Sequence, residues 1–181
     1  MEKPKSKPKL KSKPKKTIDK IFYLDKQEIK AGGILFYRIK NDNIDLLLIK
    51  RNNKYEDFGG KVDEEDNNIE ETIAREVEEE SNKIFKKENI INILKDNIEN
   101  YYYNKTSKYL LYLVKLNSDF DTNVDKFGNM ENHDKIFRRV EYVKLETFLD
   151  KEFQNNICFR LKIYSLLNKL RQLLVQNNSN L

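Results

Sequence analysis

The sequence predicts an α/β fold in which a mixed β-sheet is covered on both faces by helices. Residues 34–39 and 46–49 are two apolar runs joined by the polar turn 40–43, which is the pattern of a β-hairpin. Aliphatic residues recur at every fourth position over 69–77, which indicates an amphipathic helix. Because both strand runs are mostly apolar, with Arg38 as the one charged residue, and do not alternate, we expect both faces of the sheet to be buried.

The composition favours one soluble domain with an N-terminal tail. The chain has 181 residues, enough for a domain of about 150 residues with a real core. No run approaches the ~18 apolar residues that span a membrane, and no apolar segment follows the basic N-terminus as in a signal peptide. The single cysteine, Cys158, fits a reducing compartment. We therefore expect an intracellular protein, cytoplasmic or nuclear, with Cys158 packed in a helix.

The first 18 residues are expected to form a disordered basic arm. All three prolines lie in 1–16, where eight lysines against Glu2 give +7, so the rest of the chain carries −2 of the total +5. Such a segment cannot bury a core. It could contact RNA or another polyanion, or carry a nuclear import signal at 13–16. A solubilising arm without a partner would have the same composition.

The predicted helix over 69–80 carries an uncompensated negative charge. Asn67 or Asn68 can cap its start, and Asn82 can take the left-handed conformation that ends a helix. From Asp63 to the end of the helix there are ten acids and a single base. A solvated helix would normally interleave lysines with so many acids, so this charge needs another explanation.

Three of these acids form a candidate metal site. Glu76, Glu79 and Glu80 fall within about 100° of one another around the helix. Their mutual repulsion and their position near the helix C-terminus each cost on the order of a few tenths of a kcal/mol. Mg²⁺ or Mn²⁺ would compensate them, because hard cations bind carboxylate oxygens and keep water and phosphate as further ligands. Gly59 and Gly60 allow close approach of the backbone, with a Gly60 carbonyl as a further ligand.

This stretch resembles the signature of the Nudix hydrolases, G-x5-E-x7-R-E-U-x-E-E-x-G-U, where U is aliphatic. The residues that match it directly are Gly60, Arg75, Glu76, Val77, Glu79 and Glu80. The resemblance implies a Nudix-type α/β/α sandwich over 19–176, with a mixed sheet and a loop-helix-loop metal site. It also implies that Glu76, Glu79 and Glu80 hold Mg²⁺ or Mn²⁺, that Glu76 or Glu79 acts as general base, and that Arg75 orients the carboxylates.

The sequence departs from this signature at three points. Counted from Gly60, the first glutamate falls on Asp66 and the arginine comes one residue late, so the loop holds a one-residue insertion. The first acid is therefore open among the four acids of 63–66. Asn82 replaces the closing glycine, a mild change because both tolerate a left-handed cap. Lys83 or Ile84 stands for the last aliphatic residue.

Further polar residues are candidates for substrate binding or catalysis. Cations near the glycines could hold substrate phosphates, although solvated surface residues would look the same; these are Lys50, Arg51, Lys54 and Lys61. By the resemblance, an acid or histidine outside the signature can bind a metal or act as base, and the candidates are Glu131, His133, Asp134 and Glu141. A lone loop histidine is more often simply solvated.

The remaining segments complete the sheet and its cover. Residues 88–100 are ambiguous, whereas 101–103 and 109–116 indicate a second hairpin whose tyrosines build the core in preference to stacking a base. A strand is expected around 138–143. Apolar residues at helical spacing predict a helix from about 156 to 176 that covers the sheet, with dimerisation as the alternative. Residues 177–181 are expected to fray.

Together these features predict a divalent-metal-dependent Nudix pyrophosphohydrolase that cleaves a diphosphate linked to a further group X. The basic arm favours capped RNA or a diphosphoinositol polyphosphate as substrate. The residues at 55–58 and the Asn-rich insertion resemble Nudix proteins of large DNA viruses, some of which remove RNA caps. The alternatives are hydrolysis of a nucleoside triphosphate or nucleotide sugar, and a catalytically dead Nudix-like module that binds polyanions. A purely structural interaction protein fits least, because it would not need the glycines or the register of 75–80.

Overall fold

The computed structural model describes residues 20–117 and 123–179. The basic arm expected at 1–18 lies outside these residues. Among the residues described, no helix has the length and apolar character needed to cross a membrane.

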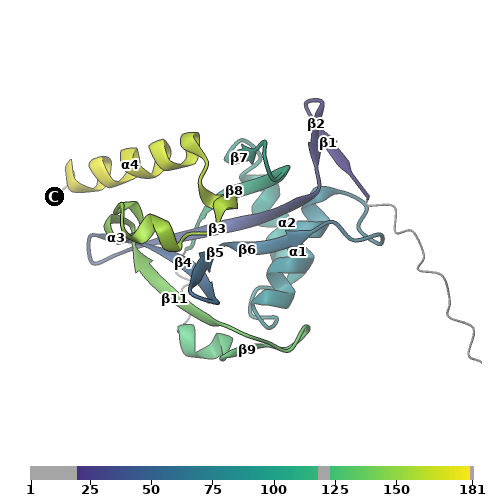
Figure 1. Ribbon diagram of the computed structural model, residues 1–181, viewed down its shortest axis with the longest axis horizontal. Coiled ribbons are helices and arrows are strands. Elements are labelled where there is room, and N and C mark those ends of the chain that lie inside the picture. The colour runs from purple at the N-terminus through teal and green to yellow at the C-terminus, as the bar shows by residue number, and fades with distance from the viewer. Residues whose placement is uncertain (1–19, 118–122, 180–181) are drawn as a thin grey trace, which may run out of the picture.

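The centre of the molecule is a mixed sheet with the strand order β11-β4-β3-β8-β7 (Figure 1). β3 and β8 run parallel, whereas the other neighbours are antiparallel. Two short strands also join this sheet: β5 pairs with β4, and β6 pairs with β3. The strands are β3 (Ala31–Lys40), β4 (Asn43–Arg51), β5 (Lys54–Glu56), β6 (Phe58–Lys61), β7 (Tyr101–Asn104), β8 (Tyr109–Lys115) and β11 (Arg139–Lys144).

Helices cover the two faces of this sheet, as expected for an α/β/α sandwich. In Figure 1, α3 and α4 lie at the left of the view, and α1 and α2 lie nearer its right-hand side. The helices are α1 (Ile69–Glu80), α2 (Lys87–Asp96), α3 (Leu145–Leu149) and α4 (Tyr164–Ser179), and the 3₁₀ turns are η2 (Val124–Phe127), η3 (Phe153–Asn156) and η4 (Phe159–Leu161). The ambiguous segment 88–100 is thus largely the helix α2.

Alternation along the central strands divides the core into two layers. Ile34 and Phe36 of β3 pack in the layer of α1 and α2, whereas Leu35 between them packs in the layer of α3 and α4. Successive side chains of a strand point to opposite faces, so a continuous apolar run produces this division. Tyr109 and Tyr112 of β8 are buried in the two layers, which confirms a core role for them.

Two short hairpins form two-stranded sheets separate from the central one, and neither is predicted from the sequence. β1 (Phe22–Leu24) pairs with β2 (Gln27–Ile29), and β9 (Met130–Glu131) pairs with β10 (Ile136–Phe137). Strands of two or three residues are too short to show a periodic pattern.

The helix predicted from about 156 to 176 is wrong over 156–163. The 3₁₀ turns η3 and η4 occupy 153–156 and 159–161, and α4 begins only at Tyr164 and continues to Ser179. The Cys158 backbone N–H donates to the Tyr55 carbonyl at 2.9 Å, and Ile157 forms a β-bridge with Tyr55. These contacts hold the segment extended against β5 and override its helical spacing. Cys158 therefore lies half-buried outside a helix. Of the residues expected to fray, 177–179 belong to α4 and 180–181 lie outside the described residues.

Candidate active site

The helix α1 places the acidic residues because both of its ends are fixed. The Asn68 side chain accepts a hydrogen bond of 2.8 Å from the backbone N–H of Glu71, which caps the first turn. At the other end Asn82 has the left-handed φ of 54°, as its sequence position predicts. Ile69, Ile73 and Val77 are buried in the core, and the acidic residues lie on the adjacent face of the helix.

The Arg75 guanidinium binds Asp66, the residue that stands where the signature has its first glutamate. Arg75 Nε donates to Asp66 Oδ1 at 3.1 Å and Nη2 to Oδ2 at 3.0 Å. The Thr72 hydroxyl and the Asp63 backbone N–H each donate to Oδ2 at 2.8 Å. Burial raises the pKa of the Asp66 carboxyl, but these hydrogen bonds outweigh it and the pKa is lowered. Of the four acids left open in the loop, Asp66 is the one that pairs with Arg75.

Arg75 also brings two of the predicted metal ligands together. Its Nη1 donates to Glu76 Oε1 at 3.0 Å and to Glu79 Oε2 at 3.3 Å, so one nitrogen joins both carboxylates. Its Nη2 donates to the Lys61 carbonyl at 3.0 Å. A Cβ atom at Gly60 would overlap the carboxylate of Glu76, so the glycine is needed for Glu76 to lie against the strand β6.

Glu80 points into the protein and is held by two donors. The backbone N–H of Gly59 donates to Glu80 Oε2 at 2.7 Å, and Arg51 Nη2 donates to Oε1 at 3.2 Å. Burial raises the pKa of Glu80 to about 8, although Arg160, the Gly59 N–H and Arg51 all act to lower it. Glu80 is 5% exposed, so its carboxylate lies at the inner wall of the site.

Two arginines connect Glu80 to the segment that carries Glu131. Arg51 Nη2 contacts Glu131 Oε2 at 3.0 Å, and burial raises the pKa of Glu131. Arg138 Nη2 donates to the Glu80 carbonyl at 2.5 Å and Nη1 to the Gly128 carbonyl at 3.2 Å. The Nε atoms of Arg51 and Arg138 are buried and have no hydrogen-bond partner in the part of the chain that the structure describes. Such donors are costly to leave unpaired, and an anionic ligand would satisfy them.

Asn82 fastens the loop that carries Glu131 to the end of α1. Its Nδ2 donates to the carbonyls of Phe127 and Met130, each at 2.8 Å, and its Oδ1 accepts from the Asn132 N–H at 2.8 Å. A glycine, as in the family signature, could not make these bonds. The sequence predicts Asn82 only as a helix end, because no local pattern indicates its contacts with the distant loop.

The structure brings some of the distal candidates to the acidic face. His133 Nδ1 lies 3.7 Å from Glu79 Oε2 and 2.9 Å from Asp134 Oδ1. Among the described residues, the group with three potential metal-ligand atoms all within 4.8 Å is Glu131, His133 and Asp134. Glu141 instead pairs with the exposed Arg139.

Of the four candidate cations, Arg51 is the one that contacts acids of the candidate site, Glu80 and Glu131, within the part of the chain that the structure describes. The Lys50 ammonium donates to the Tyr55 hydroxyl at 3.1 Å, and that of Lys54 to the Asn155 carbonyl at 2.6 Å. The Lys61 side chain is exposed, and this residue meets Arg75 through its carbonyl.

A buried charge network that the sequence analysis did not identify lies next to Gly59. Asp57 is fully buried and accepts from the Tyr109 hydroxyl at 2.6 Å and from Arg160 Nε at 2.7 Å. A Cβ at Gly59 would overlap the Tyr109 hydroxyl, so the Tyr109 side chain can reach Asp57 only because residue 59 is a glycine. Arg160 is 103 residues from Asp57, and no local pattern connects two such positions.

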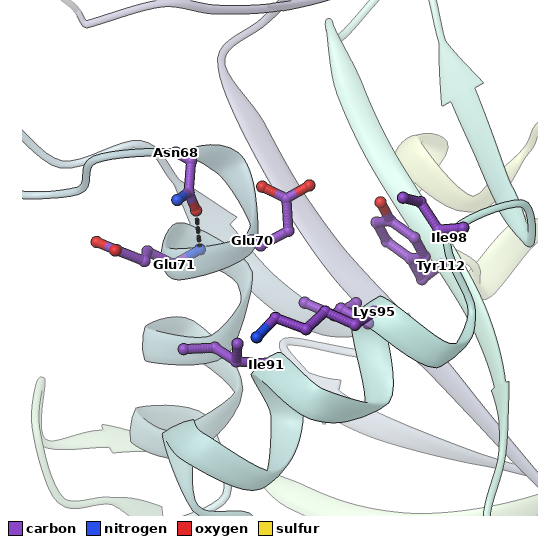
Figure 2. A pocket seen from close by; sticks show the side chains of 8 residues that line it. Asn68, Glu70, Glu71, Ile91, Lys95, Ile98 and Tyr112 are labelled. Atoms are coloured by element: carbon purple, nitrogen blue, oxygen red, sulfur yellow. Dashed lines mark hydrogen bonds between the residues drawn. The ribbon is translucent and has the colours of Figure 1, made fainter.

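Two of the cavities lined by described residues differ in their relation to the acidic residues of α1. A cavity of 670 Å³ is lined by Lys50, Asn52, Asn53, Asn129, Phe137, Arg138 and Arg139, and so includes the neighbours of Arg51 and the arginine that contacts Glu80. A hollow of 380 Å³ lies between the start of α1 and α2. It is lined by residues such as Glu70, Lys95 and Tyr112 (Figure 2). Glu70 and Glu79 are about 13 Å apart along the helix axis, so this hollow is not part of the candidate site.

Comparisons with known proteins identify the family. The model of the NUDIX domain matches residues 29–159, whereas a search of the curated proteins found no significant match. A structure of an Ap4A hydrolase from C. elegans, a binary complex, is similar with a TM-score of 0.52 and 20% identity, over 82% of this chain and 98% of that one. A second structure of that hydrolase has a TM-score of 0.42 and 20% identity over 84% and 96% of the two chains. The structure of Shewanella oneidensis NrtR with a 27mer DNA has a TM-score of 0.41 and 12% identity over 81% and 62%. Because the domain model spans most of the sequence and all of the acidic helix, the chain belongs to the Nudix hydrolase family.

Proposed function

We propose that the protein is a divalent-metal-dependent pyrophosphohydrolase whose ions are held by Glu76, Glu79 and Glu80, with the Gly60 carbonyl as a further ligand. The observation that carries this proposal is the Arg75 guanidinium, which contacts Asp66, Glu76 and Glu79 together. An arginine that binds several carboxylates fixes their direction through charge-assisted hydrogen bonds. Its role is to position the ligands, as outer-sphere partners do at metal sites.

The residues present fit a hard divalent cation. Glu76 and Glu79 share a single guanidinium nitrogen, so their carboxylates are turned to the same side of α1. Glu76 lies against Gly60 in space that any other residue would fill with a Cβ. Carboxylate and carbonyl oxygens are the ligands that Mg²⁺ and Mn²⁺ prefer.

The chemistry follows from charge. A divalent cation bound there would screen the phosphates and lower the pKa of a bound water. Glu76 or Glu79 accepts the proton of the attacking water, because these two carboxylates are less enclosed than Glu80. Arg51 and Arg138 each have an Nε–H without a partner among the described residues, and their guanidinium groups would bind phosphate oxygens. Attack on a phosphorus of the diphosphate then releases two phosphate-containing products.

The pairing of Asp66 with Arg75 favours an active enzyme over a dead binding module. The aspartate side chain is one methylene shorter than the glutamate of the signature, and the loop is one residue longer. Both oxygens of Asp66 nevertheless contact Arg75. The substitution therefore preserves the contact that orients Glu76 and Glu79.

The substrate is proposed to be a polyphosphate compound, and two features bear on its class. The lysine-rich segment 1–16 favours a large polyanion such as capped RNA or a diphosphoinositol polyphosphate. The similar C. elegans enzyme is, by its name, a hydrolase of Ap4A, which makes a dinucleoside polyphosphate a further candidate. Nucleoside triphosphates and nucleotide sugars remain the smaller alternatives.

The test is product release from a panel of these compounds, with Mn²⁺ or with EDTA. We expect metal-dependent cleavage of at least one class, and a loss of at least about 100-fold in kcat for Glu80→Gln, because metal-assisted stabilisation is worth several kcal/mol. Glu70→Gln is the matched control, since Glu70 lies on the same helix but lines the separate hollow. Equal rates for wild type and Glu80→Gln would contradict the site assignment.

A further inference from the structure

We propose that Tyr109 and Arg160 position the metal ligand Glu80. They do so from inside the protein, through Asp57 and the backbone of Gly59, so both are positioning residues that do not touch the substrate. This inference rests on the proposed metal site and extends it, because it gives the buried network a role in metal binding besides its role in stability.

The link between the network and the metal site is the backbone N–H of Gly59. It donates to Glu80 Oε2 at 2.7 Å, and the Glu80 side chain is buried. The other oxygen, Oε1, contacts the Arg51 guanidinium at 3.2 Å. A hydrogen bond from a backbone N–H to a carboxylate is charge-assisted and short. The direction of the Glu80 carboxylate therefore depends on where the chain lies at residue 59.

The Tyr109 hydroxyl fixes the chain at this point because it fills the space beside two paired glycines. Gly59 of β6 pairs with Gly33 of β3, and a Cβ atom at either position would overlap the hydroxyl oxygen. The same hydroxyl donates to Asp57 Oδ2 at 2.6 Å. Tyr109 is itself buried, so the strand that carries Gly59 has no room to move towards it.

Arg160 holds the same strand at both the side chain and the main chain of Asp57. Its Nε donates to Asp57 Oδ1 at 2.7 Å, and its Nη2 donates to the Asp57 carbonyl at 3.1 Å. A guanidinium can make two such bonds because its donors form a rigid planar fork. Arg160 therefore fixes the backbone two residues before the N–H that holds Glu80.

Stability alone is a weak reason for a charged network at this place. Apolar side chains of similar volume often replace a buried ion pair with no loss of stability, and Tyr109 already packs in an apolar layer of the core. Hydrogen bonds add direction, which a metal ligand needs. Partners that orient a ligand from behind commonly control metal affinity as strongly as this network is expected to do.

The test is a titration of Mn²⁺ into Tyr109→Phe, which removes one hydroxyl and leaves the Arg160 and Asp57 pair in place. We expect Mn²⁺ affinity to fall by about 10- to 100-fold, the usual effect of losing such a partner, and kcat to fall with it while KM changes little. Tyr103→Phe is the matched control, because the Tyr103 hydroxyl donates to the Glu28 carbonyl at 2.7 Å. Equal Mn²⁺ affinity in Tyr109→Phe and Tyr103→Phe would overturn the inference.

Arg160→Lys is the second variant, and it tests geometry apart from charge. Lysine keeps the positive charge beside Asp57 but lacks the fork that reaches its carbonyl. We expect a folded protein that binds Mn²⁺ at least about tenfold more weakly than the wild type. Urea unfolding measures the folded fraction, so a loss of stability is not counted as a loss of affinity. Wild-type Mn²⁺ affinity in the folded Arg160→Lys protein would also contradict the positioning role.

Glu80→Gln separates this inference from the proposed function. Weak Mn²⁺ binding by Glu80→Gln together with wild-type binding by Tyr109→Phe would reject the positioning role and leave the metal site standing. Wild-type Mn²⁺ binding by Glu80→Gln would reject the metal site and, with it, the positioning role.

Discussion

Arg75 is the residue on which the acidic face of α1 depends. Its guanidinium donates to three carboxylates and to the Lys61 carbonyl, so it joins the loop before the helix to the helix itself. Its position relative to Glu76 and Glu79 could be predicted from the signature. Its pairing with Asp66 could not, because the one-residue insertion left four acids as candidates, and only the folded loop brings one of them to Arg75.

Gly60 is the residue at which the geometry of the site can be changed most selectively. In Gly60→Ala the new Cβ would overlap the carboxylate of Glu76, which is the end of a flexible side chain and can turn away. We expect the fold to be kept and kcat/KM to fall by about 100-fold, the effect of displacing a reacting group by about 1 Å. Steady-state kinetics measure the fall in kcat/KM, and thermal unfolding measures whether the fold is kept. Wild-type activity in a normally folded Gly60→Ala protein would show that Glu76 is not needed against this strand.

At the scale of elements, the parts of the site defined by local patterns could be predicted, and those defined by tertiary contacts could not. The limits of α1 follow from the Asn68 cap, the apolar stripe and the left-handed Asn82. The helix expected from 156 begins only at Tyr164, because Ile157 and Cys158 pair with Tyr55 instead. The position of Glu131 beside Arg51 likewise depends on a loop whose anchor is a distant side chain.

Asn82 connects two of these elements, and its replacement separates them. Asn82→Gly keeps a residue that accepts a left-handed φ, so α1 should end as before. The carbonyls of Phe127 and Met130 lose their donor, and we expect the free energy of unfolding to fall by about 1–3 kcal/mol. Urea unfolding measures this change. The control is Asn41→Gly, at another left-handed asparagine with φ of 48°, and an equal effect of the two would contradict the anchoring role.

At the scale of the whole molecule, the network of Asp57, Tyr109 and Arg160 ties the C-terminal segment to the strand that carries the glycines. Arg160 Nε and the Tyr109 hydroxyl hold the two oxygens of a fully buried carboxylate. These residues come from three distant parts of the chain. The Nudix fold could be predicted from the acidic helix and the strand pattern, but this network lies outside every local motif.

Breaking this network should destabilise the entire domain. Arg160→Met leaves Asp57 buried and without its cation, and the loss of one partner of a buried ion pair costs about 3–5 kcal/mol. We expect a correspondingly lower urea midpoint for unfolding. The double variant Asp57→Asn, Arg160→Met should recover part of the loss, because its buried side chain is neutral. A double variant as unstable as Arg160→Met alone would show that packing, and not charge, explains the effect.

The most direct test of the central claim is a titration of Mn²⁺ into the wild type and Glu79→Gln, followed by hydrolysis of the preferred substrate. If the acidic face of α1 holds the catalytic ion, Glu79→Gln should bind Mn²⁺ at least about tenfold more weakly and lose activity in step, since each tenfold change is about 1.4 kcal/mol. Glu70→Gln should behave as the wild type. Equal Mn²⁺ affinity and equal hydrolysis in the wild type and Glu79→Gln would contradict the claim that this face is the metal site.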